Sequence, residues 1–180
     1  MGICIYEEGV RQVNNNSTTV FEGVVLKADR DNFTKLRKKH FPSDKILVLE
    51  KAIGLNDLDM VGDIESGDMR LDDRTYSLFL LVCGEHPSYQ LIDKQIISNS
   101  DLKTPLAIKP PATGEEIKQY RENANAMRQG KMAWLLGLSS KKYVSYYENK
   151  EKTGVSPSIQ CWTLFLLIIN QHSFFRLKRK

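Results

Sequence analysis

The sequence predicts a mostly α-helical protein made of two related domains. Three features support this prediction: part of the chain recurs 83 to 86 residues later, apolar residues follow helical spacing in both copies, and glycine or proline separates the helical stretches. With 180 residues, 41% hydrophobic and 27% charged, the chain has room for two small folded domains.

The repeat defines the domain organisation. Residues 76–91 align without gaps on residues 162–177 with six of sixteen positions identical, and residues 52–67 align on 135–150. Positions that both copies share should belong to the scaffold, and positions that differ are candidates for function. We expect four segments: an N-terminal arm or hairpin (1–26), a degenerate first domain (27–92), a linker (93–112) and a second domain (113–180).

Two β-branched runs precede the first copy, at Ile3 to Tyr6 and Thr18 to Leu26. They predict a small hairpin or an arm. Helical spacing begins at Asp29 and resumes after the break at Pro42, and Gly54 is expected to stop the second helix. Two further helices are expected over 58–66 and 75–84, and a β-like stretch over 89–97.

The second copy begins with a helix start signal. Thr113 and Glu116 form a capping box, which predicts a helix from Gly114 to about Ala126. Helices are then expected over 128–136, 140–149 and 158–170, with a turn at Gly137. The second copy is therefore expected to be a compact domain of at least four helices.

Net charge differs sharply between the two halves. Residues 1–112 carry 14 Lys and Arg against 17 Asp and Glu, whereas residues 113–180 carry 12 against 5. The net charges are therefore −3 and +7, which predicts a second half that binds a polyanion and a first half with another role.

The segment from Met127 to Ser139, MRQGKMAWLLGLS, resembles the helix-turn-helix core of the Cro and C1-type phage repressors and their bacterial relatives. The family pattern is matched at Gln129, Ala133, Leu136, Gly137, Ser139, Glu148 and Pro157. One departure is a recognition helix that is one residue longer than usual. The resemblance covers about 60 residues, from Thr113 to Asn170, and implies two tandem helix-turn-helix domains of about five helices each.

This resemblance implies a transcriptional regulator, a repressor that binds double-stranded DNA at an inverted repeat as a homodimer. The recognition helix would lie in the major groove with its cationic, hydroxyl-rich face on base edges and phosphates. The basic tail from Arg176 to Lys180 could add phosphate contacts. The candidate DNA-binding residues are Gln129, Lys131, Ser139, Ser140, Lys141, Lys142, Tyr143, Ser145, Tyr146 and Lys150.

The first copy keeps the scaffold positions but is acidic where the second is basic. Its equivalent face would be repelled by DNA phosphates, so we expect this copy to form the dimer contact or to bind a basic partner. An alternative function follows: a phage- or plasmid-encoded inhibitor of a protein, with the acidic copy as a DNA mimic. The residues of this face are Asn56, Asp57, Leu58, Asp59, Met60, Gly62 and Asp63.

A calcium loop is another interpretation of the same acidic stretch. Asp57, Asp59, Gly62 and Asp68 match positions one, three, six and twelve of such a loop, but Val61 at position five offers no side-chain oxygen. We therefore expect no metal site. No glycine loop, metal-ligand spacing or acid–base pair predicts a cofactor or an enzyme, and we expect no catalytic residues.

The remaining features suit a cytoplasmic protein, and the DNA binding that the resemblance implies would associate it with the nucleoid. Cys4, Cys83 and Cys161 are dispersed, as expected in a reducing compartment, and the longest apolar run, Leu164 to Ile169, is too short to span a membrane.

Histidines and tryptophans receive structural interpretations. We expect His86 and His172 to donate to free carbonyls at the ends of helices, and Trp134 and Trp162 to lie in the core.

Overall fold

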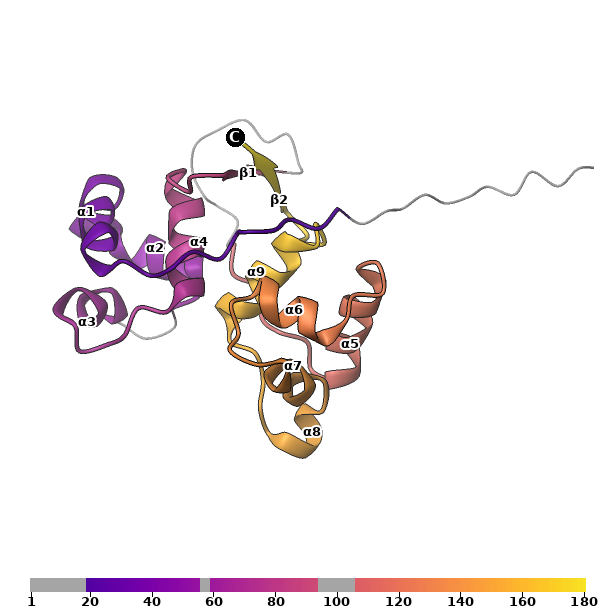
Figure 1. Cartoon of the computed structure of the whole chain (residues 1–180). Coiled ribbons are helices and arrows are strands. Elements are labelled where there is room, and N and C mark those ends of the chain that lie inside the picture. Colours follow the sequence, from indigo (N-terminus) through magenta and orange to yellow (C-terminus); the bar gives the residue numbers. More distant parts are fainter. Residues whose placement is uncertain (1–18, 56–58, 94–105) are drawn as a thin grey trace, which may run out of the picture.

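The computed structural model describes residues 19–55, 59–93 and 106–180; the β-branched run at Ile3 to Tyr6 and residues 56–58 lie outside these ranges. The described residues form nine α-helices, one short 3-10 helix and a two-stranded sheet, which confirms the mostly α-helical class (Figure 1). In this part of the chain, no helix has both the length and the apolar character needed to cross a bilayer.

Copy one follows the predicted helices, and local capping explains where they begin and end. The Asp29 side chain accepts from the amide of Asn32 at 2.9 Å and starts the first helix, while Gly54, with φ of 73°, ends the second. The described part of the preceding arm, residues 19–28, contains no strand. The elements are α1 (Arg30–His40), η1 (Ser43–Lys45), α2 (Ile46–Ile53), α3 (Met60–Ser66), α4 (Asp73–Cys83) and β1 (Tyr89–Asp93).

Copy two contains two elements that were not expected, a short helix and a C-terminal strand. The capping box of Thr113 and Glu116 is confirmed, but its helix ends at Asn123 because Asn125 and Ala126 have positive φ. The basic tail forms the second strand of the sheet. The elements are α5 (Gly114–Asn123), α6 (Gln129–Leu135), α7 (Lys141–Glu148), α8 (Lys150–Thr153), α9 (Ile159–Ile168) and β2 (Phe175–Arg179).

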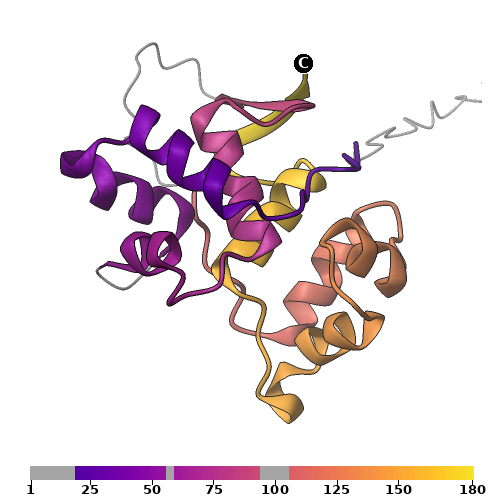
Figure 2. The ribbon, with the colours of Figure 1, turned by 60° about the vertical axis from the view of Figure 1, so that its left-hand side comes forward.

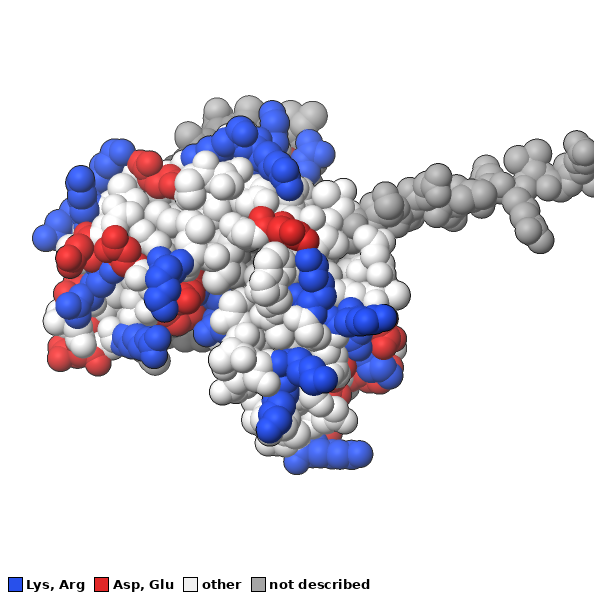
Figure 3. Space-filling view, viewed as in Figure 1, with Lys and Arg blue, Asp and Glu red and all other residues white. Residues whose placement is uncertain are grey.

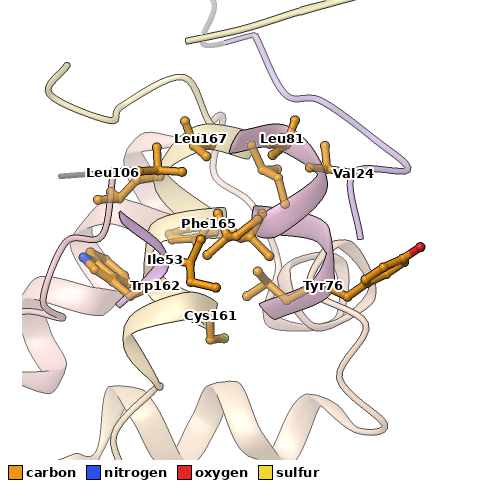
Figure 4. Packing of buried hydrophobic residues seen from close by; sticks show 14 of the residues in the cluster. Val24, Ile53, Tyr76, Leu81, Leu106, Cys161, Trp162, Phe165 and Leu167 are labelled. Carbon is orange, nitrogen blue, oxygen red and sulfur yellow. The ribbon is translucent and has the colours of Figure 1, made fainter. Parts of the chain in front are cut away.

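The two copies share one hydrophobic core, in which α4 packs against α9. These helices occupy equivalent positions of the repeat, and each is buried along most of its length. In Figure 4 the equivalent pair Leu81 and Leu167 lies at the same end of the two helices, with Val24 and Leu106 to either side. The copies are therefore related by an approximate twofold axis that runs between α4 and α9.

The pairing of the two strands follows the same approximate twofold symmetry. Strands β1 and β2 are antiparallel, and Leu91 pairs with Leu177, which is its own equivalent in the repeat. On either side, Tyr89 pairs with Arg179 and Asp93 with Phe175, which are again related by the repeat. The basic tail was expected to add phosphate contacts. It is instead one strand of the pair that joins the two copies (Figure 2).

Extended segments before α1 and α5 cross between the copies. Ala107 lies over Gly54 in copy one, where its amide donates to the carbonyl of Ala52 at 3.1 Å. In the reciprocal contact, Val25 lies over Gly137 in copy two. Each copy therefore covers the turn between the second and third helices of the other.

Each crossing segment is anchored to the last helix of its own copy by matching hydrogen bonds. The amide of Leu26 donates to Ser77 Oγ at 2.8 Å, and the amide of Ile108 donates to Thr163 Oγ1 at 2.9 Å. Ser77 and Thr163 are equivalent in the repeat, so the polar contacts are duplicated with the scaffold.

The two equivalent histidines hold these segments in place rather than capping helix carbonyls, which corrects the expectation for His86 and His172. The His86 Nδ1 accepts from the amides of Ser88 and Tyr89 at 3.2 Å, so the proton lies on Nε2, which donates to the Val24 carbonyl at 2.9 Å. His172 repeats this arrangement, with Nε2 bonded to the Leu106 carbonyl at 2.8 Å. The helix carbonyls are satisfied instead by backbone amides.

We predict that Gly54→Ala destabilises the protein more than Gly84→Ala. Both glycines have φ near +70°, so either alanine costs about 1–2 kcal/mol of unfolding free energy. A Cβ on Gly54 would lie 2.6 Å from Ile159 Cγ2, which adds about 1–3 kcal/mol, whereas Gly84 faces open space. Urea denaturation measures both, and equal losses would contradict the described contact between the copies.

We also predict that acid weakens the fold through His86. Burial lowers the pKa of His86 below its ordinary value, although the hydrogen bond to Val24 opposes this. The unfolded chain therefore binds more protons, so this stability is complete above about pH 6.5 and is lost as pH falls through the depressed folded pKa, by up to about 1.4 kcal/mol per pH unit.

Denaturation of His86→Asn between pH 7 and pH 5 should show a shallower loss of stability, because the asparagine does not titrate. His40→Asn is the matched control and should keep the acid sensitivity of the wild type, since His86 remains. Identical pH profiles for wild type and His86→Asn would overturn this explanation.

Candidate nucleic-acid interface

The pair of helices α6 and α7 presents the candidate interface, and its geometry follows from a few residues. Gly137, with φ of 60°, makes the tight turn between the helices. Ala133 is buried where α6 meets α7, and Val144 and Tyr147 point into the core as expected. Burial raises the pKa of Tyr147 to about 12, so its hydroxyl stays neutral. The buried side of α7 is thus fixed, and its opposite side is left for solvent.

A buried ion pair fastens the end of α7 to α5. Arg121 Nε donates to Glu148 Oε1 at 2.5 Å and a second nitrogen donates to Glu148 Oε2 at 3.2 Å, with side-chain exposures of 9% and 4%. The carboxylate holds the pKa of Arg121 above its ordinary value. Such a two-point contact fixes distance and orientation together.

Copy one repeats this ion pair. Arg37 donates to both oxygens of Glu65, at 2.8 and 2.5 Å. Glu148 was singled out as a position of the family pattern, but both arginines were missed. The sequence gives one indication of this pair. Arg37 aligns with Arg121 at an offset of 84 residues, and the aligned helices share no other identical residue.

The exposed face of α7 carries much of the predicted set. Lys141, Lys142, Tyr143 and Tyr146 are exposed, and Ser145 is half-buried between them. The two tyrosine rings meet edge to face, with centroids 6.5 Å apart. Figure 3 shows basic side chains over α7 with no acidic side chain among them. The only carboxylate of the helix is the inward Glu148.

Two serines of the predicted set lie at the start of this helix. Ser140 caps α7, its hydroxyl accepting from the amide of Lys142 at 3.2 Å, and Ser139 before it is exposed. The cap leaves Ser140 with a hydroxyl proton that it can still donate.

Three other predicted residues are engaged by partners within the chain. Gln129 donates to Glu148 Oε2 at 2.7 Å, and Lys150 donates to the Pro111 carbonyl at 2.8 Å. Lys131 forms an ion pair with Glu22 of the N-terminal arm. The structure therefore places these three side chains beside the α7 face, in contacts that support the scaffold.

Trp134 is exposed, which shows that its expected place in the core was wrong. Its side of α6 faces solvent with 60% exposure, and the Lys131 Nζ lies 4.4 Å from the ring centroid. Trp162, by contrast, is buried in the core as expected.

The equivalent face in copy one is acidic where it is described. Asp59, Asp63 and Asp68 are exposed around α3, and Asp57 lies outside the described residues. The described part of the chain contains no group of three His, Cys, Asp or Glu side chains placed to hold a metal ion. Copy one also replaces the small Ala133 by Glu50, whose buried carboxylate accepts from the amide of Val61 at 3.3 Å.

We predict that Arg121→Met lowers the free energy of unfolding by about 3–5 kcal/mol, because it leaves the buried Glu148 without its cation. The matched change Arg37→Met should cost less, since the Glu65 side chain is 19% exposed. Denaturation of the double variant Arg121→Met/Glu148→Met should show a smaller loss than Arg121→Met alone. If Arg121→Met loses no more unfolding free energy than Arg37→Met, the structural role of the Arg121–Glu148 pair is contradicted.

Comparison with known proteins adds no independent identification. No protein-family model, curated protein or solved structure matches the chain. The function is therefore inferred from the geometry and charge of the α7 face.

Proposed function

We propose that the protein is a sequence-specific, double-stranded DNA-binding transcriptional regulator, a repressor, that inserts α7 into the major groove. The observation that carries this proposal is the exposed face of α7, which joins two lysines to tyrosine and serine hydroxyls without a carboxylate. A partner of this kind would place the protein on the nucleoid in the cytoplasm.

The chemistry of this face suits both parts of a DNA contact. Lys141 and Lys142 can neutralise phosphates or donate to guanine acceptors, and hydroxyl groups can donate to either. The buried pair of Arg121 and Glu148 supports recognition because it holds α7 rigidly against α5. A rigid helix loses little conformational entropy when it binds.

The approximate twofold axis relates α3 to α7 as the axis of a dimeric repressor would relate its two recognition helices. In Figures 1 and 2, α3 and α7 both lie toward the end of the molecule opposite the β1–β2 pair. Of these two helices α7 carries the basic face and α3 the acidic one, so one chain would read one half-site. Two chains in the expected homodimer would then read an inverted repeat, whose symmetry mirrors theirs.

A second candidate is an inhibitor that binds a DNA-binding protein through copy one. The observation in its favour is the set of exposed carboxylates around α3, at Asp59, Asp63 and Asp68. This helix occupies the scaffold position of α7, so its charges would stand where a DNA mimic needs them. Such an inhibitor would keep its activity when the α7 lysines are reversed.

The test is selection of bound duplexes from a random DNA pool, with wild type and Lys141→Glu/Lys142→Glu. We predict a motif for the wild type and a loss of affinity for it on the order of thirtyfold or more in the variant, because two cationic contacts become repulsive. The slope of log affinity against log salt should fall by about two.

The matched control is Lys35→Glu/Lys38→Glu, which makes the same charge change on the exposed side of α1. This control should bind the selected motif nearly as well as the wild type. If the two double variants lose the same affinity for DNA, the loss comes from net charge alone. That outcome would contradict recognition of the motif by α7.

A further inference from the structure

A hollow of about 460 Å³ lies where copy one meets the beginning of α7. Copy one lines it with the loop before α4 and the first turn of that helix, and copy two lines it with the α6–α7 turn and α7. Ser139 and Tyr143 are among the lining residues and also belong to the exposed face proposed to meet DNA. The hollow therefore lies directly beside that face.

Arg70, from copy one, is the cation of this hollow that has no partner among the described residues. It is exposed and makes no ion pair or hydrogen bond with any residue that the structure describes. The other arginine of the lining, Arg74, differs, because its Nε donates to Asp72 at 3.1 Å.

The two carboxylates of the hollow are already engaged. Asp72 caps α4, accepting from the amides of Arg74 and Thr75 and from the Thr75 hydroxyl. Asp73 accepts from the amide of Ala28 at 2.9 Å and lies 3.8 Å from Lys27 Nζ. These contacts reduce the repulsion that the carboxylates would exert on an anion, and Arg70 makes no ion pair with any residue that the structure describes.

On the other side of the twofold axis, copy two contacts Gly54, which is the equivalent of Gly137. There the Gln160 amide donates to the carbonyl of Gly54 at 2.8 Å, and Ile159 lies against the same glycine. Ile159 and Gln160 are the equivalents of Asp73 and Arg74 in the repeat. Side chains of copy two thus cover the turn at Gly54, whereas the hollow lies at the equivalent turn at Gly137.

We propose that this hollow binds one phosphate of the DNA backbone, with the Arg70 guanidinium and the hydroxyls of Ser139 and Tyr143 donating to its oxygens. The proposal rests on the proposed function and assigns copy one a direct part in it. A guanidinium matches the geometry of phosphate oxygens and carries its charge at any physiological pH. Because Arg70 belongs to the other copy, its contact would fix how deeply and at what angle α7 enters the groove.

The experiment compares Arg70→Ala with Lys35→Ala, which removes one exposed positive charge of copy one that does not line the hollow. Each protein is titrated with the selected duplex over a range of salt, and with duplexes that carry one uncharged methylphosphonate at successive positions. Arg70→Ala should bind about tenfold more weakly, with a salt slope lower by about one. Lys35→Ala should bind like the wild type.

The methylphosphonate series identifies the phosphate itself. One substitution should weaken binding of the wild type and have no further effect on Arg70→Ala, and Tyr143→Phe should reduce the effect of the same substitution. Because Arg70 is exposed and unpaired among the described residues, its removal should leave the thermal midpoint unchanged.

The phosphate site is wrong if Arg70→Ala binds DNA as tightly as Lys35→Ala and every methylphosphonate acts equally on wild type and Arg70→Ala. Recognition of DNA by α7 still stands in that case, provided that Lys141→Glu/Lys142→Glu loses binding. If the wild type selects no motif, the proposed function and this site fail together.

Discussion

The structure depends on two apolar helices, α4 and α9, that cover each other. In α9 every residue from Cys161 to Ile168 is buried, and α4 is buried from Thr75 to Leu81. A helix that is apolar on all sides needs neighbours on all sides, and a single copy of this small domain supplies too few. The second copy supplies the rest. The crossing segments and the β1–β2 pair add further contacts between the two copies.

Local chemistry explains the parts of the fold that could be predicted from sequence. The capping box at Thr113 and the turns at Gly54 and Gly137 are encoded within a few residues, and each is found where expected. Strand β2 could not be predicted in this way. Its sequence from Phe175 to Arg179 looks like a basic tail, and it becomes a strand only because β1, 86 residues earlier, offers a partner.

The same distinction applies to the candidate site. The resemblance to a helix-turn-helix pattern predicted that Lys141, Lys142 and Tyr143 lie on the exposed face of one helix, and all three are exposed. It gave no information on partners that are distant in sequence. Glu22, which pairs with Lys131, belongs to the N-terminal arm, and Arg70, which lines the hollow beside α7, belongs to copy one. A comparison of the copies helps here, since it shows which contacts the scaffold repeats and which it does not.

The covalent link between the two copies has a consequence for how the protein behaves on dilution. Two separate chains that met through α4, α9 and the paired strands would come apart as their concentration fell. Here both partners belong to one chain, so their meeting is intramolecular and its equilibrium does not depend on concentration. The two halves therefore remain together in a cell that holds very few molecules of the protein, and the face of α7 keeps its support under the same conditions.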